Sequence, residues 1–104
     1  MTNNKKIGEV IIGRLGRDPE LKYTLKSEPV CNFSLAIEGE DSIKPIWKRI
    51  VVWGKLAETC SVHLKKGVKV FVQGPSEWKS FKLNNGETKT YEEVCAREIG
   101  FTLI

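Results

Sequence analysis

Cysteine and histidine are scarce in this sequence, and their scarcity excludes several kinds of site. The chain has three cysteines, Cys31, Cys60 and Cys95, and one histidine, His63. Three widely separated cysteines form neither a disulfide framework nor a CxxC-type metal site. They are expected to be small, buried or half-buried apolar residues in a reducing compartment. A zinc site or a Ser-His-Asp triad would have to be built around the single histidine, and the sequence does not favour either.

Long apolar runs and catalytic motifs are also missing. No stretch approaches the ~20 apolar residues that span a bilayer, so no membrane partner is expected. The start, MTNNKKIGEV, has neither the apolar region nor the cleavage site of a secretory signal, which indicates the cytoplasm. The sequence has no paired carboxylates, thiol–histidine pair, P-loop or metal-ligand spacing. It therefore predicts a protein that is not an enzyme and that needs no cofactor or metal.

The residues that are present suit a small basic globular protein. A chain of 104 residues, 40% hydrophobic and 29% charged, is expected to form one domain over residues 1–104 with a modest core. Lysine and arginine number 17 against 13 aspartate and glutamate, which gives a formal net charge of +4 and a pI near 9.0. This balance favours a polyanionic partner.

Short alternating segments separated by turn residues predict strands along most of the chain. EVIIGRLG, residues 9–16, begins as an apolar strand, and Gly13 and Gly16 predict a bulge or a sharp bend. VCNFSLAIE, residues 30–38, and VKVFVQG, residues 68–74, alternate cleanly between apolar and other side chains. Each is therefore expected to turn one face to a core.

One helix and one hairpin complete the predicted pattern. In GKLAETCSVHLKKG, residues 54–67, apolar residues recur at helical spacing and predict about three turns, with Lys65 and Lys66 in the last turn and Gly67 at C′. The segment around NNGE predicts a hairpin with a turn at Asn85–Gly86. About five strands, with a helix between the third and fourth and an extended hairpin between the fourth and fifth, indicate an all-β, five-stranded Greek-key OB-fold barrel.

The strand PIWKRIVVW, residues 45–53, leaves two interpretations open. Its alternation puts Trp47, Arg49, Val51 and Trp53 on one face and Ile46, Lys48, Ile50 and Val52 on the other. Tryptophan is usually largely buried, so the indoles could fill the core. Alternatively Ile50 and Val52 fill a small barrel, and Arg49, which is costly to bury unpaired, lies outside between two rings. That outer arrangement suits single-stranded nucleic acid.

Five segments together resemble the bacterial single-stranded DNA-binding protein (SSB) family. They are IIGRLGRDPELKYT, VCNFSLA, WKRIVVWGKLAE, HLKKG and YEEV. The resemblance runs from about Val10 to the C-terminus. It implies an OB-fold, a homotetramer, a nucleoid-associated location, and sequence-tolerant binding and protection of single-stranded DNA in replication, recombination or repair. It also implies that the tryptophan face carries the DNA.

The resemblance assigns roles to individual side chains. Trp47, Trp53 and Phe81 match aromatic positions on which bases stack. The matching cations, which would contact the DNA and neutralise its phosphates, are Arg49, Lys79, Lys55, Lys65, Lys66 and, in the first bend, Arg14. Judged on the residues alone, Phe81 could instead pack on a hairpin neighbour, and the lysine pair could simply cap the helix.

Two departures from the family concern the DNA-binding surface. The loop GEDSIKP, residues 39–45, is shorter than usual and lacks an aromatic side chain, so weaker binding is expected. The acidic residues in or beside this loop are Glu38, Glu40 and Asp41. In the hairpin, Glu77 replaces a basic residue and Trp78 is an additional aromatic. Trp78 is either a substitute stacking residue or part of a protein contact.

Two further departures concern partners. Lys48 stands where the family usually has a subunit-interface histidine, which leaves a dimer open beside the tetramer. The family usually continues past the barrel into a linker and an acidic tip, whereas this sequence stops at Ile104. Either the tail has been removed or the protein is a tail-less paralogue, and tail-mediated recruitment of replication proteins is not expected. Both departures favour the alternative function, a PriB-like dimeric replication-restart adaptor that bridges single-stranded DNA and a protein partner.

Overall fold

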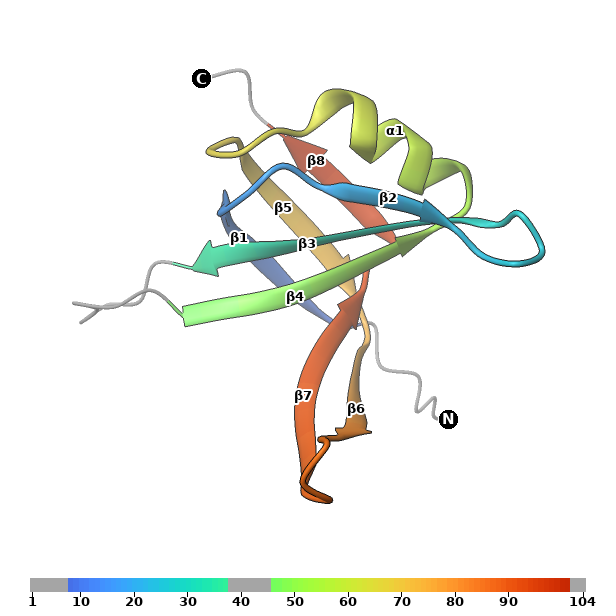
Figure 1. Cartoon of the computed structure of the whole chain (residues 1–104). Coiled ribbons are helices and arrows are strands. Elements are labelled where there is room, and N and C mark those ends of the chain that lie inside the picture. Colours follow the sequence, from blue (N-terminus) through green and yellow to red (C-terminus); the bar gives the residue numbers. More distant parts are fainter. Residues whose placement is uncertain (1–7, 38–45, 102–104) are drawn as a thin grey trace, which may run out of the picture.

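The computed structural model describes residues 8–37 and 46–101, which form a barrel, one helix and a projecting arm (Figure 1). The elements are β1 (Glu9–Leu15), β2 (Glu20–Tyr23), β3 (Pro29–Ile37), β4 (Ile46–Trp53), α1 (Lys55–His63), β5 (Lys69–Gly74), β6 (Ser76–Lys82), β7 (Thr88–Cys95) and β8 (Glu98–Phe101). The predicted loop at 39–45 and its acidic residues lie outside the described residues. The helix lies across one end of the barrel, and the arm projects from the other (Figure 1).

The eight strand segments are five strands, three of which are bent. β1 and β2 are separated by a bend that begins at Gly16, β5 and β6 by Pro75, and β7 and β8 by residues 96–97. β7 pairs with β4 in parallel, whereas its continuation β8 pairs with β5. Because β1 pairs with both β3 and β5, the sheet closes on itself. The predicted OB-fold, with the helix between the third and fourth strands, is confirmed.

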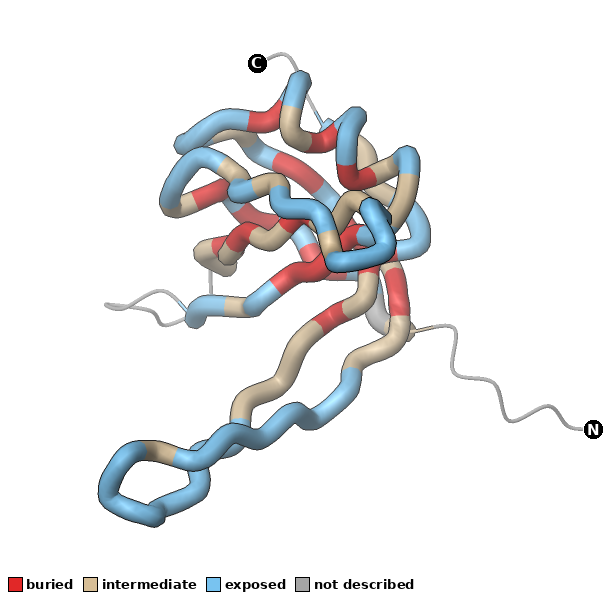
Figure 2. The backbone as a smooth tube through the Cα atoms, turned by 45° about the vertical axis from the view of Figure 1, so that its right-hand side comes forward, coloured by how far each residue is buried: buried red, intermediate tan, exposed pale blue. Residues whose placement is uncertain are grey.

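The inner faces of the strands supply the core, as the alternation predicted. In β3, Cys31 and Leu35 are fully buried, and in β5, Val70 and Val72 are 1% and 0% exposed. Figure 2 shows this alternation of buried and exposed residues along the barrel. No polar or charged side chain is buried within the two described ranges. The core is therefore held together by apolar packing, which leaves the outer faces available for other roles.

The cysteines fill space in or beside the core, as predicted. Cys31 and Cys60 are buried, Cys95 is half-buried, and all three are free thiols. Burial raises the pKa of the Cys31 thiol. Burial, and secondarily the neighbouring Cys31, raises the pKa of Cys60 to about 11. Both thiols therefore stay protonated at neutral pH and behave as small apolar side chains.

The helix ends earlier than its spacing predicted. α1 stops at His63, and its C-cap residue Leu64 has an extended backbone and a side chain that is only 2% exposed. Burying Leu64 turns the chain away from the helix axis, so Lys65 and Lys66 lie beyond the helix and Gly67 is not its C′ residue. The predicted placement of these three residues is wrong. Within the described part of the chain, no helix is long and apolar enough to cross a membrane.

The predicted hairpin is confirmed, and it forms an arm that leaves the barrel (Figures 1 and 2). Its turn, residues 83–87, is closed by two backbone bonds. The Leu83 N–H donates to the Glu87 carbonyl at 2.7 Å, and the Gly86 N–H donates to the Leu83 carbonyl at 3.0 Å. Residues 77–82 of β6 are all exposed. In the described sheet β6 is the end strand, so one edge of the arm has no neighbouring strand.

Candidate nucleic-acid interface

The outer face of β4 carries both tryptophans of the central strand. Trp47 is 54% exposed and Trp53 is 44% exposed, whereas Ile50 and Val52 on the opposite face are 1% and 0% exposed. The barrel is thus filled by the β-branched aliphatic residues, and the indoles lie outside it. The second of the two interpretations of this strand is the one that the structure shows.

The same face includes one exposed cation and one covered valine. Arg49 is exposed between the tryptophans, as predicted. Val51, by contrast, is only 7% exposed. β7 runs beside it, with Cys95 in register and the Ala96 N–H donating to the Val51 carbonyl at 2.9 Å. Both side chains therefore keep the predicted outer face, Arg49 exposed and Val51 covered, and Val51 is not part of the core cluster that contains Ile50 and Val52.

A row of neighbouring side chains leads from β4 onto the arm. The Arg49 guanidinium carbon lies 4.2 Å from the centroid of the Tyr91 ring on β7. The Tyr91 and Phe81 ring centroids are 5.9 Å apart, with the rings tilted by 58°. A guanidinium held over an aromatic face is partly immobilised in a plane, which suits contact with a base or a phosphate. Sequence reasoning missed Tyr91, although the alternation of the hairpin puts it on the same face as Phe81.

A hollow of about 760 Å³ opens beside this row. Its floor includes Asn32 and Ser34, which are short outward side chains of β3. Its walls come from the bend after β1, from β2, from Trp47 and Arg49 of β4, and from Tyr91 of β7. Small side chains between taller ones create the depression, so its shape follows from the register of three neighbouring strands.

The charges that line the hollow balance one another. The cations are Arg17, Lys22 and Arg49, and the anions are Asp18, Glu20 and Glu93. Two anions already have partners: the Glu20 carboxylate lies 3.6 Å from the Lys22 ammonium, and Asp18 Oδ1 accepts the Lys66 N–H at 2.8 Å. Within the described ranges, no group of three or more His, Cys, Asp or Glu could hold a metal ion. The hollow therefore offers rings and individual cations, without a strong net field.

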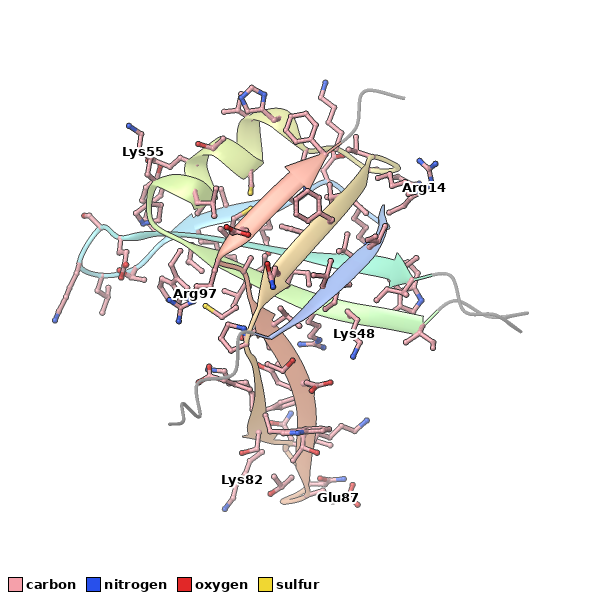
Figure 3. All side chains as sticks on the ribbon, turned by 180° about the vertical axis from the view of Figure 1, so that it is seen from behind. Arg14, Lys48, Lys55, Lys82, Glu87 and Arg97 are labelled. Carbon is pink, nitrogen blue, oxygen red and sulfur yellow. The ribbon has the colours of Figure 1, made fainter. Side chains whose placement is uncertain are left out.

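Arg14 is not where the sequence placed it. It belongs to β1, and its Nη1 donates to the Gly67 carbonyl at 2.9 Å. The strand continues through Gly13, which pairs with Val70, so the bend begins only at Gly16. The cation of the bend is Arg17. Figure 3 shows Arg14 and Lys55 on opposite sides of the barrel, so they do not belong to one compact site.

The other predicted residues are not among those that line the hollow. Trp53 ends β4, and the exposed Lys55 begins α1 two residues later. On the arm, the Lys79 ammonium lies 3.6 Å from the Glu77 carboxylate, and Lys79 is in register with Tyr91. Lys66 is exposed in the turn after the helix, and Phe81 is 44% exposed on β6. All five side chains are accessible, although they are spread over three elements and a turn.

The absence of a side chain at Gly16 leaves room for the Trp47 indole. A Cβ added at Gly16 would lie 2.6 Å from both Cη2 and Cζ3 of Trp47, and the three nearest atoms all belong to that ring. The indole therefore lies directly on the glycine, over the bend that follows β1. A larger residue at this position would push the ring away.

A closed barrel with exposed rings and cations on one face defines a class, the OB-fold proteins that bind single-stranded nucleic acid. Residues 8–102 match the Single-strand binding protein family, and the chain belongs to that family. The resemblance drawn from the sequence motifs is thereby confirmed.

Individual relatives agree with the family assignment. The chain is 40% identical over 95 residues to single-stranded DNA-binding protein 1 of Chlorobaculum tepidum, covering 83% of this chain and 59% of that protein. It is 35% identical over 97 residues to the single-stranded DNA-binding protein of Neisseria meningitidis serogroup A, covering 86% and 56%. For the Thermotoga maritima protein of the same description, the identity is 35% over 99 residues, covering 88% and 70%. The chain spans rather more than half the length of the first two relatives.

Proposed function

We propose that this protein binds and protects single-stranded DNA, with little regard to its sequence, in replication, recombination or repair. The observation that carries the proposal is the exposure of Trp47 and Trp53 on a strand whose other face fills the barrel. Stacking on an exposed ring tolerates any base, because every base has a π-face. The role is non-catalytic and belongs with the nucleoid in the cytoplasm.

The spacing of the rings suits an extended strand of DNA. Trp47 and Trp53 are six residues apart, which is about 20 Å along a β-strand. The two rings therefore hold different bases of one DNA strand, with the Arg49–Tyr91–Phe81 row continuing the surface onto the arm. Phosphates between the stacked bases come within reach of Arg49, and Lys55 extends the path beyond Trp53.

Titration with oligo-dT tests the proposed function. We expect tryptophan fluorescence to be quenched and the quenching to be reversed by salt, since bases stack on the indoles and cations contact the phosphates. If Arg17, Lys22, Arg49 and Lys55 each neutralise one phosphate, log affinity should fall with log salt at a slope of about −3, at ~−0.7 per phosphate. Absence of quenching, or quenching indifferent to salt, contradicts the proposal.

We further propose that the protein is a homo-oligomer, a tetramer in preference to a dimer. The support is an exposed apolar row on the outer face of β1 and β5, remote in the sheet from β4. Val10 is 56% exposed, Ile12 is 53% exposed and Phe71 is 43% exposed, and Ile12 and Phe71 are directly in register. Grouped apolar side chains on a sheet surface are typical of a subunit contact.

Sedimentation at several protein concentrations measures the assembly. We expect a tetramer, and we expect Ile12→Glu to reduce the mass, because a carboxylate in an apolar contact is costly to desolvate. Val62→Ala, an exposed change on α1, is the matched control and should leave the mass unaltered. A clean dimer would instead support the PriB-like adaptor, and a monomer at every concentration would contradict both assemblies.

A further inference from the structure

Trp78 is the most exposed of the three tryptophans, at 71%, and the DNA path described above does not use it. It lies on β6, directly opposite Glu92 of β7. The Glu92 carboxylate lies 3.4 Å from the Lys48 ammonium of β4. Because residues in register on neighbouring strands point to the same side, Trp78 shares its face of the arm with the Lys48–Glu92 pair.

Phe81 lies on the other face of the arm. It packs against Tyr91, which in turn lies beneath Arg49. Arg49 and Lys48 are consecutive in β4, so their side chains leave the strand in opposite directions. The two faces of the arm are thus separately anchored to the barrel by neighbouring cations. Phe81 and Trp78, three residues apart, present rings on opposite sides of one sheet layer.

The surroundings of Trp78 favour a flat, charged ligand over a protein surface. Apart from Val94, which is buried at 1% exposure opposite Ser76, the residues that share its face along the arm are short and hydroxylated or charged: Ser76, Ser80, Lys82, Thr88, Thr90 and Glu92. A lone ring among such residues lacks the apolar neighbours that a protein contact buries at its centre. Hydroxyl groups and a lysine are, in contrast, common donors to phosphate oxygens. Figure 3 shows Lys82 extending outward near the tip of the arm.

A strand of DNA can pass from one face of the arm to the other around the free edge of β6. β6 is the end strand of the described sheet, so no neighbouring strand separates the two faces along that edge. Phe81 and Trp78 lie about 10 Å apart along the strand. Building on the proposed function, we propose that Trp78 is a second base-stacking site. It holds single-stranded DNA that passes around the edge of β6 from the Phe81 face to the Trp78 face.

The test uses a variant in which Trp78 is the only tryptophan. The double variant Trp47→Phe, Trp53→Phe keeps a ring at each position and leaves Trp78 as the sole tryptophan. Binding of fluorescein-labelled oligo-dT is followed by anisotropy, and Trp78 emission is followed with unlabelled oligo-dT of the same lengths. We expect short oligonucleotides to bind with little quenching and longer ones to quench Trp78, because only longer DNA reaches around the arm.

Affinity measurements on the otherwise unaltered protein complete the test. Trp78→Ala should weaken the binding of long oligo-dT at least about fivefold and that of short oligo-dT much less. Trp78→Phe should recover most of the loss, because it restores a stacking ring. A merely structural role for Trp78 would not produce this dependence on oligonucleotide length.

Three outcomes would count against the second site. If anisotropy shows binding while Trp78 emission and the Trp78→Ala affinity stay unchanged at every length, the inference is overturned and the proposed function stands. If the wavelength of maximum Trp78 emission shifts with protein concentration in the absence of DNA, the ring contacts a second copy of the chain and the inference is also overturned. If the unaltered protein binds no oligo-dT, the proposed function fails and the second site fails with it.

Discussion

Trp47→Ala is expected to weaken binding of oligo-dT about 5- to 150-fold, which corresponds to ~1–3 kcal/mol for one lost base stack. The side chain is 54% exposed, so its removal leaves no buried cavity and should alter the free energy of unfolding little. The variant should therefore lose affinity for DNA while its stability stays nearly unchanged. Anisotropy titrations at fixed salt measure the first quantity, and thermal unfolding of the same samples measures the second.

Two variants define what the Trp47→Ala result means. Trp47→Phe keeps an aromatic ring over the hollow and should retain most of the affinity. Val62→Ala removes an exposed apolar side chain from α1, away from the proposed DNA path, and should change nothing. An affinity loss well below ~1 kcal/mol would contradict the stacking role of Trp47. A marked fall in stability would show instead that the indole supports the fold.

The arrangement of β4 could be predicted from the sequence because strand periodicity is local. Alternation alone separated Trp47 and Trp53 from Ile50 and Val52. It did not say which set was inside, because both sets are apolar and tryptophan is usually buried. The aliphatic set fits the interior of a five-stranded barrel, and the resemblance to the family pointed the same way. Alternation also could not show that Val51, on the outer face, is only 7% exposed, because β7, the strand beside it, is distant in the sequence.

The hollow could not be predicted, because its walls come from segments that only tertiary structure brings together. Arg17 and Lys22 are ordinary surface cations in the sequence. They join Arg49 only because β2 and β4 lie on either side of β3. The Arg49–Tyr91 contact depends in the same way on the parallel pairing of β4 and β7. Local spacing carries no signal for either grouping.

Two predictions made from local sequence signals fail for the same reason. Cation and glycine signals predict a helix that continues through Lys65 and Lys66, but burial of Leu64 ends it first. The nearby Gly13 predicts a bend at Arg14, but pairing with β5 keeps that glycine in the strand. In each case a tertiary contact overrode a local preference. The opposite faces of Trp78 and Phe81, by contrast, follow from an odd spacing within a hairpin.

Gly16 has two roles, a bend in the chain and a contact with the Trp47 ring, and only the first could be predicted from the sequence. The sequence marked it as a bend, and the chain does turn there. The structure adds that the Trp47 ring lies on it, with Cη2 and Cζ3 only 2.6 Å from where a Cβ would stand. Since the three nearest atoms all belong to this ring, a side chain at this position displaces the indole before it disturbs the backbone.

Gly16→Val should therefore lower the affinity for oligo-dT by an amount approaching that of Trp47→Ala, about 5- to 150-fold, by moving the ring out of its stacking position. Anisotropy titration measures the loss, and a shift in tryptophan emission reports the movement of the indole. The decisive control is Gly16→Val in a Trp47→Ala background, where the valine should cost almost nothing more, because interacting residues give non-additive effects. Fully additive losses would mean that the valine blocks the DNA itself. Unchanged emission and affinity in the single variant would show that the position of the Trp47 ring does not depend on the glycine.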